Sequence, residues 1–283
     1  MKSVVVTGVS TGIGWGCVKV LVARGFHVFG SVRKQADADR LSAEFGSAFT
    51  PLIFDVTDQA AVSAAARQVQ EKLGATPLFG LVNNAGIANP GPLLHIDIDA
   101  FRQQLEVNVT AQVIVTQAFA PLLGAAPDRR TTTPGRVVMM SSVGGKVAMP
   151  FLGPYNASKF ALEAVSESLR RELMIYGVDV IVIAPGAIAT PIWDKADAID
   201  VTRYANTPYA KSLDRVKSYM LSMGKTGLPP EKIGEAVATA LTAASPKTRY
   251  TVTPQPFTDW MTRHLPKRSV DKIIAKQLGL TKP

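Results

Sequence analysis

Near its amino terminus the chain reads Val4-Val5-Val6-Thr7-Gly8-Val9-Ser10-Thr11-Gly12-Ile13-Gly14, and this stretch decides the fold. Three β-branched residues in a row, without polar alternation, predict a strand that is buried on both faces of a parallel sheet. The glycines that follow permit a tight turn, and the residues up to Arg24 have a helical pattern. Strand, glycine-rich turn and helix, in this order, present free N–H groups at a helix N-terminus, where a phosphate can bind.

The same order of strand and helix repeats along the chain. Further strands are expected over residues 26–32, 52–54, 78–82, 136–140, 178–184 and 249–253. Helices are expected over residues 36–45, 58–73, 100–123, 155–176 and 230–244. Such alternation predicts an α/β fold in which a doubly wound parallel sheet has helices on both faces, as a three-layer α/β/α arrangement. No linker or internal repeat interrupts the pattern, so residues 1–283 are expected to form a single domain.

Composition excludes several classes of protein. The 283 residues are 47% hydrophobic and 19% charged, which is typical of a globular chain. A single cysteine, Cys17, excludes a disulfide framework and fits a reducing compartment, and His27, His95 and His264 lack the spacing of metal ligands. We therefore expect no metal. No apolar run reaches the length of about 18 residues that a membrane span needs, and the first residues do not resemble a signal peptide. The prediction is a cytoplasmic protein without a transmembrane segment.

The last third of the chain departs from the strand–helix rhythm. Residues 187–227 mix aromatic and apolar side chains with charges, which predicts a helical lid over a cleft. Residues 246–283 form a C-terminal extension with eight Lys and Arg against two Asp. A solvated surface or a subunit contact is the favoured reading of this extension, and peripheral contact with a membrane is the alternative. No nucleic-acid-binding motif accompanies the charge, so no nucleic acid is expected as a partner.

Polar residues and glycines collect where the predicted strands end. The carboxyl ends of the strands carry Thr7-Gly8, Arg33, Asp55, Asn84, Ser142 and Gly186. Because ligands of doubly wound sheets bind beyond these ends, the residues are expected to meet at one site.

Tyr155 and Lys159 add the chemistry of proton transfer. Residues i and i+4 lie on one face of a helix, so the Lys159 ammonium is expected near the Tyr155 phenol. A tyrosine pKa of about 10 is too high for proton exchange at neutral pH, and a nearby cation lowers it. Ser142, at the end of a strand, could orient a substrate oxygen. Taken alone, a Tyr-x-x-x-Lys pair is also a common accident of helical sequence.

Several motifs stand in the order found in one family. They are Thr7-Gly8-x-x-x-Gly12-Ile13-Gly14, Asn83-Asn84-Ala85-Gly86, Asn108, Ser142, Tyr155-x-x-x-Lys159 and Pro185-Gly186-x-x-x-Thr190. Together they resemble the short-chain dehydrogenase/reductase family in its single-domain form, over residues 2–190. The resemblance implies a Rossmann-type fold and an NAD(P)-dependent oxidoreductase.

The resemblance also implies the role of each catalytic residue. Tyr155 would be the general acid in carbonyl reduction and the base in alcohol oxidation. Lys159 would lower the Tyr155 pKa and bind the nicotinamide ribose. Ser142 would hold the substrate oxygen, and Asn108 would anchor a water that links Lys159 to solvent.

The remaining matched positions would hold the cofactor. By resemblance, the residues that bind it are Gly8, Ser10, Thr11, Gly12, Ile13, Gly14, Arg33, Asp55, Val56, Asn84, Ala85, Gly86, Tyr155, Lys159, Pro185, Gly186, Ile188 and Thr190. The glycine turn would cradle the pyrophosphate, Asp55 and Val56 the adenine, and Ile188 and Thr190 the carboxamide.

The end of the second strand indicates which cofactor is used. A carboxylate at this point would bind the 2′-hydroxyl of NAD, but the chain reads Gly30-Ser31-Val32-Arg33-Lys34 and has no carboxylate until Asp37. Arg33 could pair with a 2′-phosphate, helped by the hydroxyls of Ser10 or Thr11. NADP(H) is therefore favoured over NAD(H).

Apolar residues around the expected cleft indicate the substrate. Besides Ser142 and Tyr155, the residues expected to touch it are Val143, Met149, Phe151, Leu152 and Trp193. Apolar walls with one polar anchor suit a hydrophobic ketone, aldehyde or alcohol. The second strand and the long C-terminal extension resemble members that act on steroids, retinoids and related lipids.

Two other functions compete with this one. A sugar-nucleotide epimerase or dehydratase of the extended branch shares Tyr-x-x-x-Lys, but the spacing of Gly8, Gly12 and Gly14 speaks against it. An NADP-binding regulatory protein is the other alternative, and the intact Ser142, Tyr155 and Lys159 set speaks against that. The helices expected over residues 100–123 and 155–176 resemble the pair that joins subunits in the family, so a homodimer or homotetramer is predicted.

Overall fold

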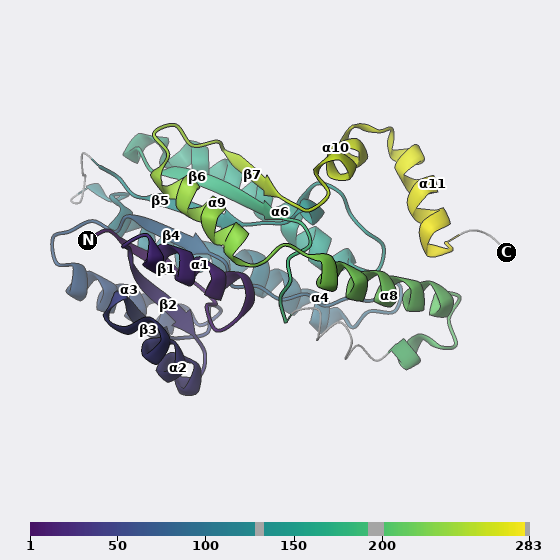
Figure 1. Ribbon diagram of the computed structural model, residues 1–283, viewed down its shortest axis with the longest axis horizontal. Helices are drawn as coiled ribbons and strands as arrows, with labels where there is room; N and C mark the ends of the chain where they lie inside the picture. The colour runs from purple at the N-terminus through teal and green to yellow at the C-terminus, as the bar shows by residue number, and fades with distance from the viewer. Residues whose placement is uncertain (128–132, 192–200, 281–283) are drawn as a thin grey trace.

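A parallel sheet of seven strands runs through the molecule. The computed structural model describes residues 1–127, 133–191 and 201–280. The strands are β1 (Ser3–Val6), β2 (His27–Val32), β3 (Phe49–Ile53), β4 (Gly80–Asn83), β5 (Arg136–Met140), β6 (Asp179–Pro185) and β7 (Arg249–Val252). They pair in the order β3-β2-β1-β4-β5-β6-β7, all parallel (Figure 1). The predicted α/β fold with a doubly wound parallel sheet is confirmed.

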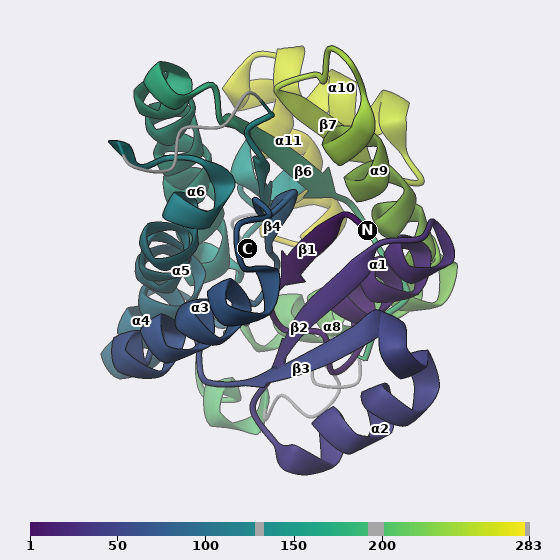
Figure 2. The ribbon, with the colours of Figure 1, turned by 90° about the vertical axis from the view of Figure 1, so that its left-hand side faces the viewer.

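Helices cover both faces of the sheet. They are α1 (Gly12–Ala23), α2 (Gln35–Phe45), α3 (Gln59–Leu73), α4 (Ile98–Leu105), α5 (Ala111–Phe119), α6 (Gly153–Glu172), α8 (Ala210–Thr226), α9 (Glu231–Thr242), α10 (Pro256–His264) and α11 (Lys267–Leu278). Figure 2 shows α3, α4, α5 and α6 on one side of the sheet, with α1, α2 and α9 on the other.

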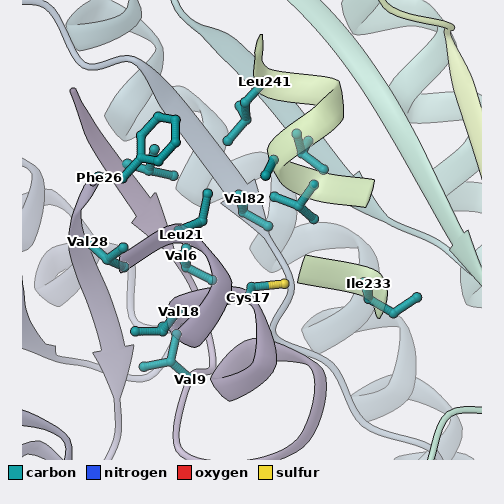
Figure 3. Close-up of a cluster of buried hydrophobic side chains, with 14 of the residues drawn as sticks. Val6, Val9, Cys17, Val18, Leu21, Phe26, Val28, Val82, Ile233 and Leu241 are labelled. Atoms are coloured by element: carbon teal, nitrogen blue, oxygen red, sulfur yellow. The ribbon is translucent and has the colours of Figure 1, made fainter. Parts of the chain in front are cut away.

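Each face of the sheet has its own hydrophobic core. Val4 and Val6 of β1 point into the core beneath α1 and α9, and Val5 points into the core beneath α3, α5 and α6. This alternation follows from the period of two in a strand. Figure 3 shows the core beneath α1 and α9, in which Cys17 lies among aliphatic side chains. Burial raises the pKa of the Cys17 thiol to about 12, so this thiol belongs to the packing.

One expected helix is interrupted. The helix predicted over residues 100–123 consists of α4, a π-helical turn Glu106–Thr110, α5 and a 3-10 turn Ala120–Leu123. The interruption falls on Asn108, whose side chain bonds to another segment. The other predicted elements are present, with ends that differ by a few residues.

Phe151, the segment predicted as a lid and the C-terminal extension share a third cluster of buried side chains. It consists of Phe151, Tyr204, Leu213, Val216 and Leu278, with further residues packed against it. Through this cluster α11 packs on α8, at the end of the molecule away from β3 and α2 (Figure 1). None of the described helices is long and apolar enough to cross a membrane.

Candidate active site

The glycine turn after β1 has the backbone that a close approach to a phosphate needs. Gly8 and Gly12 have φ angles of 68° and 61°, in the left-handed region that side chains disfavour. A Cβ on Gly14 would collide with the carbonyl oxygen of Gly8. In the described part of the chain no side chain caps the start of α1, so the first N–H groups of the helix, next to Ile13, remain available at the turn. The turn therefore fits a pyrophosphate group.

The end of β4 is tied to this turn by hydrogen bonds. The backbone N–H groups of Asn84 and Ala85 donate to Thr7 Oγ1 at 2.9 and 3.0 Å. The Asn84 side-chain amide donates to the carbonyl oxygens of Thr7 and Gly8 at 2.8 and 3.1 Å. These bonds fix two strand ends to each other, so the nucleotide-facing edge has a defined shape.

Asn108 braces the chain beyond β4. Its amide nitrogen donates to the Ile87 carbonyl and to Ser158 Oγ, each at 3.0 Å, and its oxygen accepts the Ile87 N–H at 2.9 Å. Gly86 lies against the same side chain, since a Cβ there would be 3.2 Å from Asn108 Oδ1. The side chain thus joins the β4 loop to α6. The expected role of Asn108 in holding a water stays a prediction.

Ser142, Tyr155 and Lys159 come together at the ends of β5 and β6. Ser142 Oγ accepts the Gly144 N–H at 3.0 Å and faces the Pro185 carbonyl at 3.5 Å, a long and weak hydrogen bond. Ser142 also hydrogen-bonds the Tyr155 hydroxyl. Lys159 is buried and donates to the Met140 carbonyl at 2.8 Å, with Nζ 5.7 Å from the centre of the Tyr155 ring.

The electrostatics of this group differ from the expectation. Burial raises the pKa of Tyr155, and the hydrogen bond with Ser142 partly opposes this rise. Burial lowers the pKa of Lys159 to about 8, and the charge of Glu163 acts in the opposite direction. The expected lowering of the Tyr155 pKa by Lys159 is therefore wrong for this structure, because loss of hydration dominates both groups.

The adenosine end of the site places Arg33 beside Asp55. Arg33 Nη1 lies 3.7 Å from Asp55 Oδ2, and the Arg33 side chain is 72% exposed. Asp55 also accepts from the Thr57 N–H at 3.0 Å and from its hydroxyl at 2.8 Å. These hydrogen bonds and the charge of Arg33 lower the pKa of Asp55, against a smaller opposing effect of burial. Val56 is buried in the core, so only its backbone is free to face an adenine.

A second arginine, which the sequence did not indicate, reaches the same region. Arg40 of α2 donates to the Ser10 carbonyl at 2.5 Å and pairs with Asp37 and Glu44 at 3.4 and 3.6 Å. The contact ties α2 to the glycine turn, where the exposed Thr11 precedes α1. Arg40 lies on the exposed face of a helix, which sequence periodicity cannot distinguish from an ordinary solvated face.

The end of β6 closes the site from the other side. The Gly186 N–H donates to the Val252 carbonyl at 2.8 Å, and Thr190 lies against the glycine turn, 3.3 Å from where a Cβ of Gly12 would stand. Ile188 is buried in the core and bridges Leu228. The chain after β6 therefore crosses close to the glycine turn, so both segments belong to the same edge of the site.

The expected substrate residues do not all reach the catalytic group. Val143 directly follows Ser142 and is part of the same turn. Met149 and Phe151 line a surface pocket of about 530 Å³ whose lining contains neither Ser142 nor Tyr155. Leu152 forms a bridge with Gly91. Trp193 lies outside the described residues.

Phe151 has a structural task that differs from the expected contact with substrate. It is 7% exposed, its ring centre lies 5.7 Å from that of Tyr209, and its carbonyl accepts the Gly91 N–H at 2.8 Å. Its φ of 65° is unusual for a residue with a side chain. Phe151 therefore packs against the segment predicted as a lid, and its predicted contact with a substrate stays a prediction.

A glycine turn for a pyrophosphate, with a Ser–Tyr–Lys group at the same edge of a parallel sheet, defines an NAD(P)-dependent oxidoreductase. Comparison with known proteins gives the family. Residues 2–199 match the family described as short chain dehydrogenase. The chain belongs to the short-chain dehydrogenase/reductase family and is an NAD(P)-dependent enzyme of that family.

Individual relatives cover almost the whole chain. An NADPH-dependent 3-dehydrocapnine reductase of Ornithobacterium rhinotracheale is 42% identical over 279 residues, which are 98% of each chain. Human retinol dehydrogenase 5 is 32% identical and aligns with 96% of this chain and 87% of its own. A short-chain dehydrogenase from Streptomyces avermitilis has a TM-score of 0.78 at 24% identity, over 100% of this chain and 98% of its own, and supports the fold.

Proposed function

We propose that this enzyme reduces a hydrophobic ketone or aldehyde to an alcohol with NADPH. The observation that carries the proposal is the meeting of Ser142, Tyr155 and Lys159 at the carboxyl edge of the sheet, next to the glycine turn. The reductase of Ornithobacterium rhinotracheale, whose name specifies NADPH, supports both the direction and the cofactor.

Each residue of the group has a task that its contacts allow. NADPH, when bound, supplies the hydride. Ser142 Oγ accepts the Gly144 N–H, makes a long contact with the Pro185 carbonyl and hydrogen-bonds the Tyr155 hydroxyl, so a substrate oxygen beside it would meet both hydroxyl groups. Tyr155, whose raised pKa keeps it protonated at neutral pH, donates a proton to that oxygen. Lys159 stabilises the phenolate that remains.

Preference for NADP(H) rests on the end of β2. Arg33 is exposed there, and its ion pair with Asp55 at 3.7 Å is long enough to be exchanged for a 2′-phosphate. Arg40 adds a second guanidinium close to Ser10. A bidentate contact with a phosphate is stronger than a surface ion pair, which favours NADP(H).

The substrate class rests on the relatives as well as on the apolar residues around the site. One relative is named for 3-dehydrocapnine and another for retinol, and both align with nearly the full chain. We propose an apolar substrate with one reactive oxygen, and the compounds to test first are 3-dehydrocapnine for reduction with NADPH and retinol for the reverse oxidation with NADP⁺.

The Tyr155→Phe variant tests the mechanism. It removes only the hydroxyl, so we expect kcat for ketone reduction to fall by about 100-fold or more, within the range of about 10²–10⁴ contributed by general acid catalysis. Binding of NADPH, measured by fluorescence titration, should change less than about twofold. Undiminished turnover in Tyr155→Phe would overturn the assignment.

Assembly and location stay predictions. A homodimer or homotetramer through α4, α5 and α6, in the cytoplasm, follows from the resemblance to the family. Phe257 and Trp260 of α10 are 72% and 58% exposed, which keeps peripheral membrane contact of the C-terminal extension as an alternative.

A further inference from the structure

A buried carboxylate lies directly behind the catalytic group. Glu163 of α6 is one helical turn after Lys159 and is 8% exposed. A carboxylate is rarely buried unless it is paired, because the loss of hydration is costly. Its partners therefore show what it is there to hold.

All the partners of Glu163 belong to segments that shape the active site. Glu163 Oε1 accepts from Ser141 Oγ at 2.8 Å, and both of its oxygens accept from Arg249 Nε, at 3.1 and 3.2 Å. Oε2 also lies 3.3 Å from Lys146 Nζ. Ser141 precedes the catalytic serine, and Lys146 follows the turn Val143–Gly145 that contains the Gly144 N–H.

Arg249 links the Glu163 carboxylate to the backbone of the catalytic serine, Ser142. It begins β7, and its Nη2 donates to the carbonyl oxygen of Ser142 at 3.4 Å, while Nη1 donates to Thr251 Oγ1 at 2.6 Å. The arginine side chain is 18% exposed. One guanidinium thus joins the edge strand, the buried carboxylate and the backbone of the catalytic serine.

The packing around Glu163 leaves little freedom. A Cβ on Gly145 would be 2.8 Å from Ser141 Oγ, 3.1 Å from Glu163 Cγ and 3.1 Å from the Lys159 carbonyl. The turn after Ser142 therefore packs closely against α6 beside the Glu163 side chain. A shift of this side chain would be transmitted to the turn.

We propose that Glu163 is a positioning residue, which fixes the Ser142 turn through Ser141, Arg249 and Lys146 and places a buried negative charge one helical turn from Lys159. The proposal rests on the proposed function, because it assigns Glu163 to the reduction that Ser142, Tyr155 and Lys159 perform. Glu163 acts through these residues and does not itself touch the reacting atoms.

The charges that act on this cluster come from four segments. Lys159 shares α6 with Glu163, Lys146 follows the turn, Arg249 lies on β7, and Arg263 lies on α10. Burial lowers the pKa of Arg263; the charge of Arg249 adds to this lowering, and the charges of Asp259 and Glu163 oppose it. Burial lowers the pKa of Lys159 to about 8, and Glu163 opposes this lowering. Without the carboxylate, Lys159 would thus lose its proton at a lower pH.

The test compares Glu163→Gln with Glu167→Gln in the full-length protein. Glutamine keeps the volume and can still accept from Ser141, but it removes the charge. Glu167 is on the same helix, one turn further, and pairs with Arg171 at the surface, so its change is the matched control. Titration of Lys159 is followed by the NMR signal of its Cε in lysine-labelled protein, assigned with Lys159→Met.

In Glu163→Gln the midpoint of the Lys159 titration should fall by about one pH unit, the lower end of the effect of a close charge, because Arg249 and Lys146 share the carboxylate. The high-pH limb of kcat/KM for ketone reduction should move in the same direction, and kcat at pH 7 should fall about tenfold. In Glu167→Gln both quantities should stay as in the wild type.

Arg249→Gln is a second variant, which should shift the Lys159 titration midpoint in the opposite direction. It removes a cation that competes for Glu163, so the Lys159 midpoint should rise. Retained NADPH binding shows that each variant is folded. Unchanged midpoints in both variants would overturn the proposal. If ketones are not reduced by the wild type but the Lys159 midpoint still shifts, the proposed function fails while the coupling of Glu163 to Lys159 stands.

Discussion

Lys159 loses its proton at a much lower pH than an exposed lysine. An exposed lysine keeps its proton to a pH above 10, but burial lowers the pKa of Lys159 to about 8. Burial shifts the pKa of Tyr155 in the other direction, upward, so the pKa of the lysine comes to lie below that of the tyrosine. The lysine, and not the tyrosine, is therefore the first of the pair to lose its proton as pH rises.

The pH dependence of reduction follows from this order. Protonated Lys159 stabilises the phenolate, and its proton is lost as pH rises through about 8. We expect kcat/KM for ketone reduction to be highest below this pH and to fall about tenfold per pH unit well above it. A profile of kcat/KM from pH 6 to 10 measures this decrease, and the profile of Lys159→Met should not show it. A wild-type profile that stays flat to pH 10 would contradict the assignment.

Arg33 provides the second prediction at this scale. If it binds a 2′-phosphate, Arg33→Ala should lower kcat/KM for NADPH about tenfold and leave that for NADH within about twofold. The effect is at the low end for a charged hydrogen bond because the side chain is 72% exposed. Arg24→Ala, at an exposed position beyond α1, is the control. An equal loss of kcat/KM with NADPH and with NADH would show that Arg33 does not bind the 2′-phosphate.

At the scale of elements, the π-helical turn Glu106–Thr110 depends on one side chain. Asn108 is 1% exposed and satisfies both backbone groups of Ile87 and the hydroxyl of Ser158. Asn108→Ala removes the partner of the Ile87 N–H, while the Ile87 carbonyl keeps its bond from Gln104 and Ser158 Oγ keeps its bond to the Tyr155 carbonyl, so the free energy of unfolding should fall by about 1–3 kcal/mol. Urea unfolding measures this.

A neighbouring glutamine distinguishes this effect from a change in helix propensity. Gln103 is exposed on α4, and Gln103→Ala should change the free energy of unfolding by less than about 0.5 kcal/mol. Equal stability of the Asn108 and Gln103 variants would show that the turn does not need the Asn108 bonds.

The elements themselves could be predicted because their signals are local. Val4, Val5 and Val6 mark a buried strand without reference to any other segment, and the glycines after them mark the turn. The interruption at Asn108 could not be predicted, since the bonds that this side chain makes there go to Ile87 and to Ser158, which is 50 residues away. Hydrophobic periodicity contains no information about contacts with other segments. It therefore predicted one continuous helix over residues 100–123.

In the site, as in the fold, the residues with a local sequence signal could be predicted, and the contacts made by the fold could not. Ser142, Tyr155 and Lys159 stood out because their order and spacing match a family. Glu163 could have been noticed at i+4 from Lys159, but its partner Arg249 is 86 residues away, and only the fold brings them together. Met149 and Phe151 were predicted to touch the substrate because they lie between Ser142 and Tyr155 in the sequence, and only the structure shows that Phe151 packs with Tyr209 and α8.

At the scale of the whole molecule, the carboxyl edge of the sheet serves two groups of elements. The glycine turn, β2 and β4 form the half that fits a dinucleotide. The third hydrophobic cluster joins Phe151 to α8 and α11, and it forms the other half around the lid. Because the clusters are separate, a change in the lid can leave the dinucleotide half intact.

Leu278 tests whether the C-terminal extension supports the lid. It is 2% exposed at the end of α11 and packs with Leu213 and Val216 of α8. Leu278→Ala should weaken this packing by about 2–4 kcal/mol, as is usual when a buried leucine is truncated. Because α8 belongs to the segment predicted as a substrate lid, KM for the ketone should rise while the Kd for NADPH stays within about twofold.

Ile273→Ala is the matched control, because Ile273 lies on the same helix but is 49% exposed. Steady-state kinetics with the ketone, NADPH titration and limited proteolysis within α8 together separate the outcomes. Faster cleavage of α8 with a raised KM in Leu278→Ala alone would show that the extension acts through the lid. A parallel loss of NADPH binding would instead show that the two halves unfold as one unit, because weakening the third cluster would then also disorder the glycine turn.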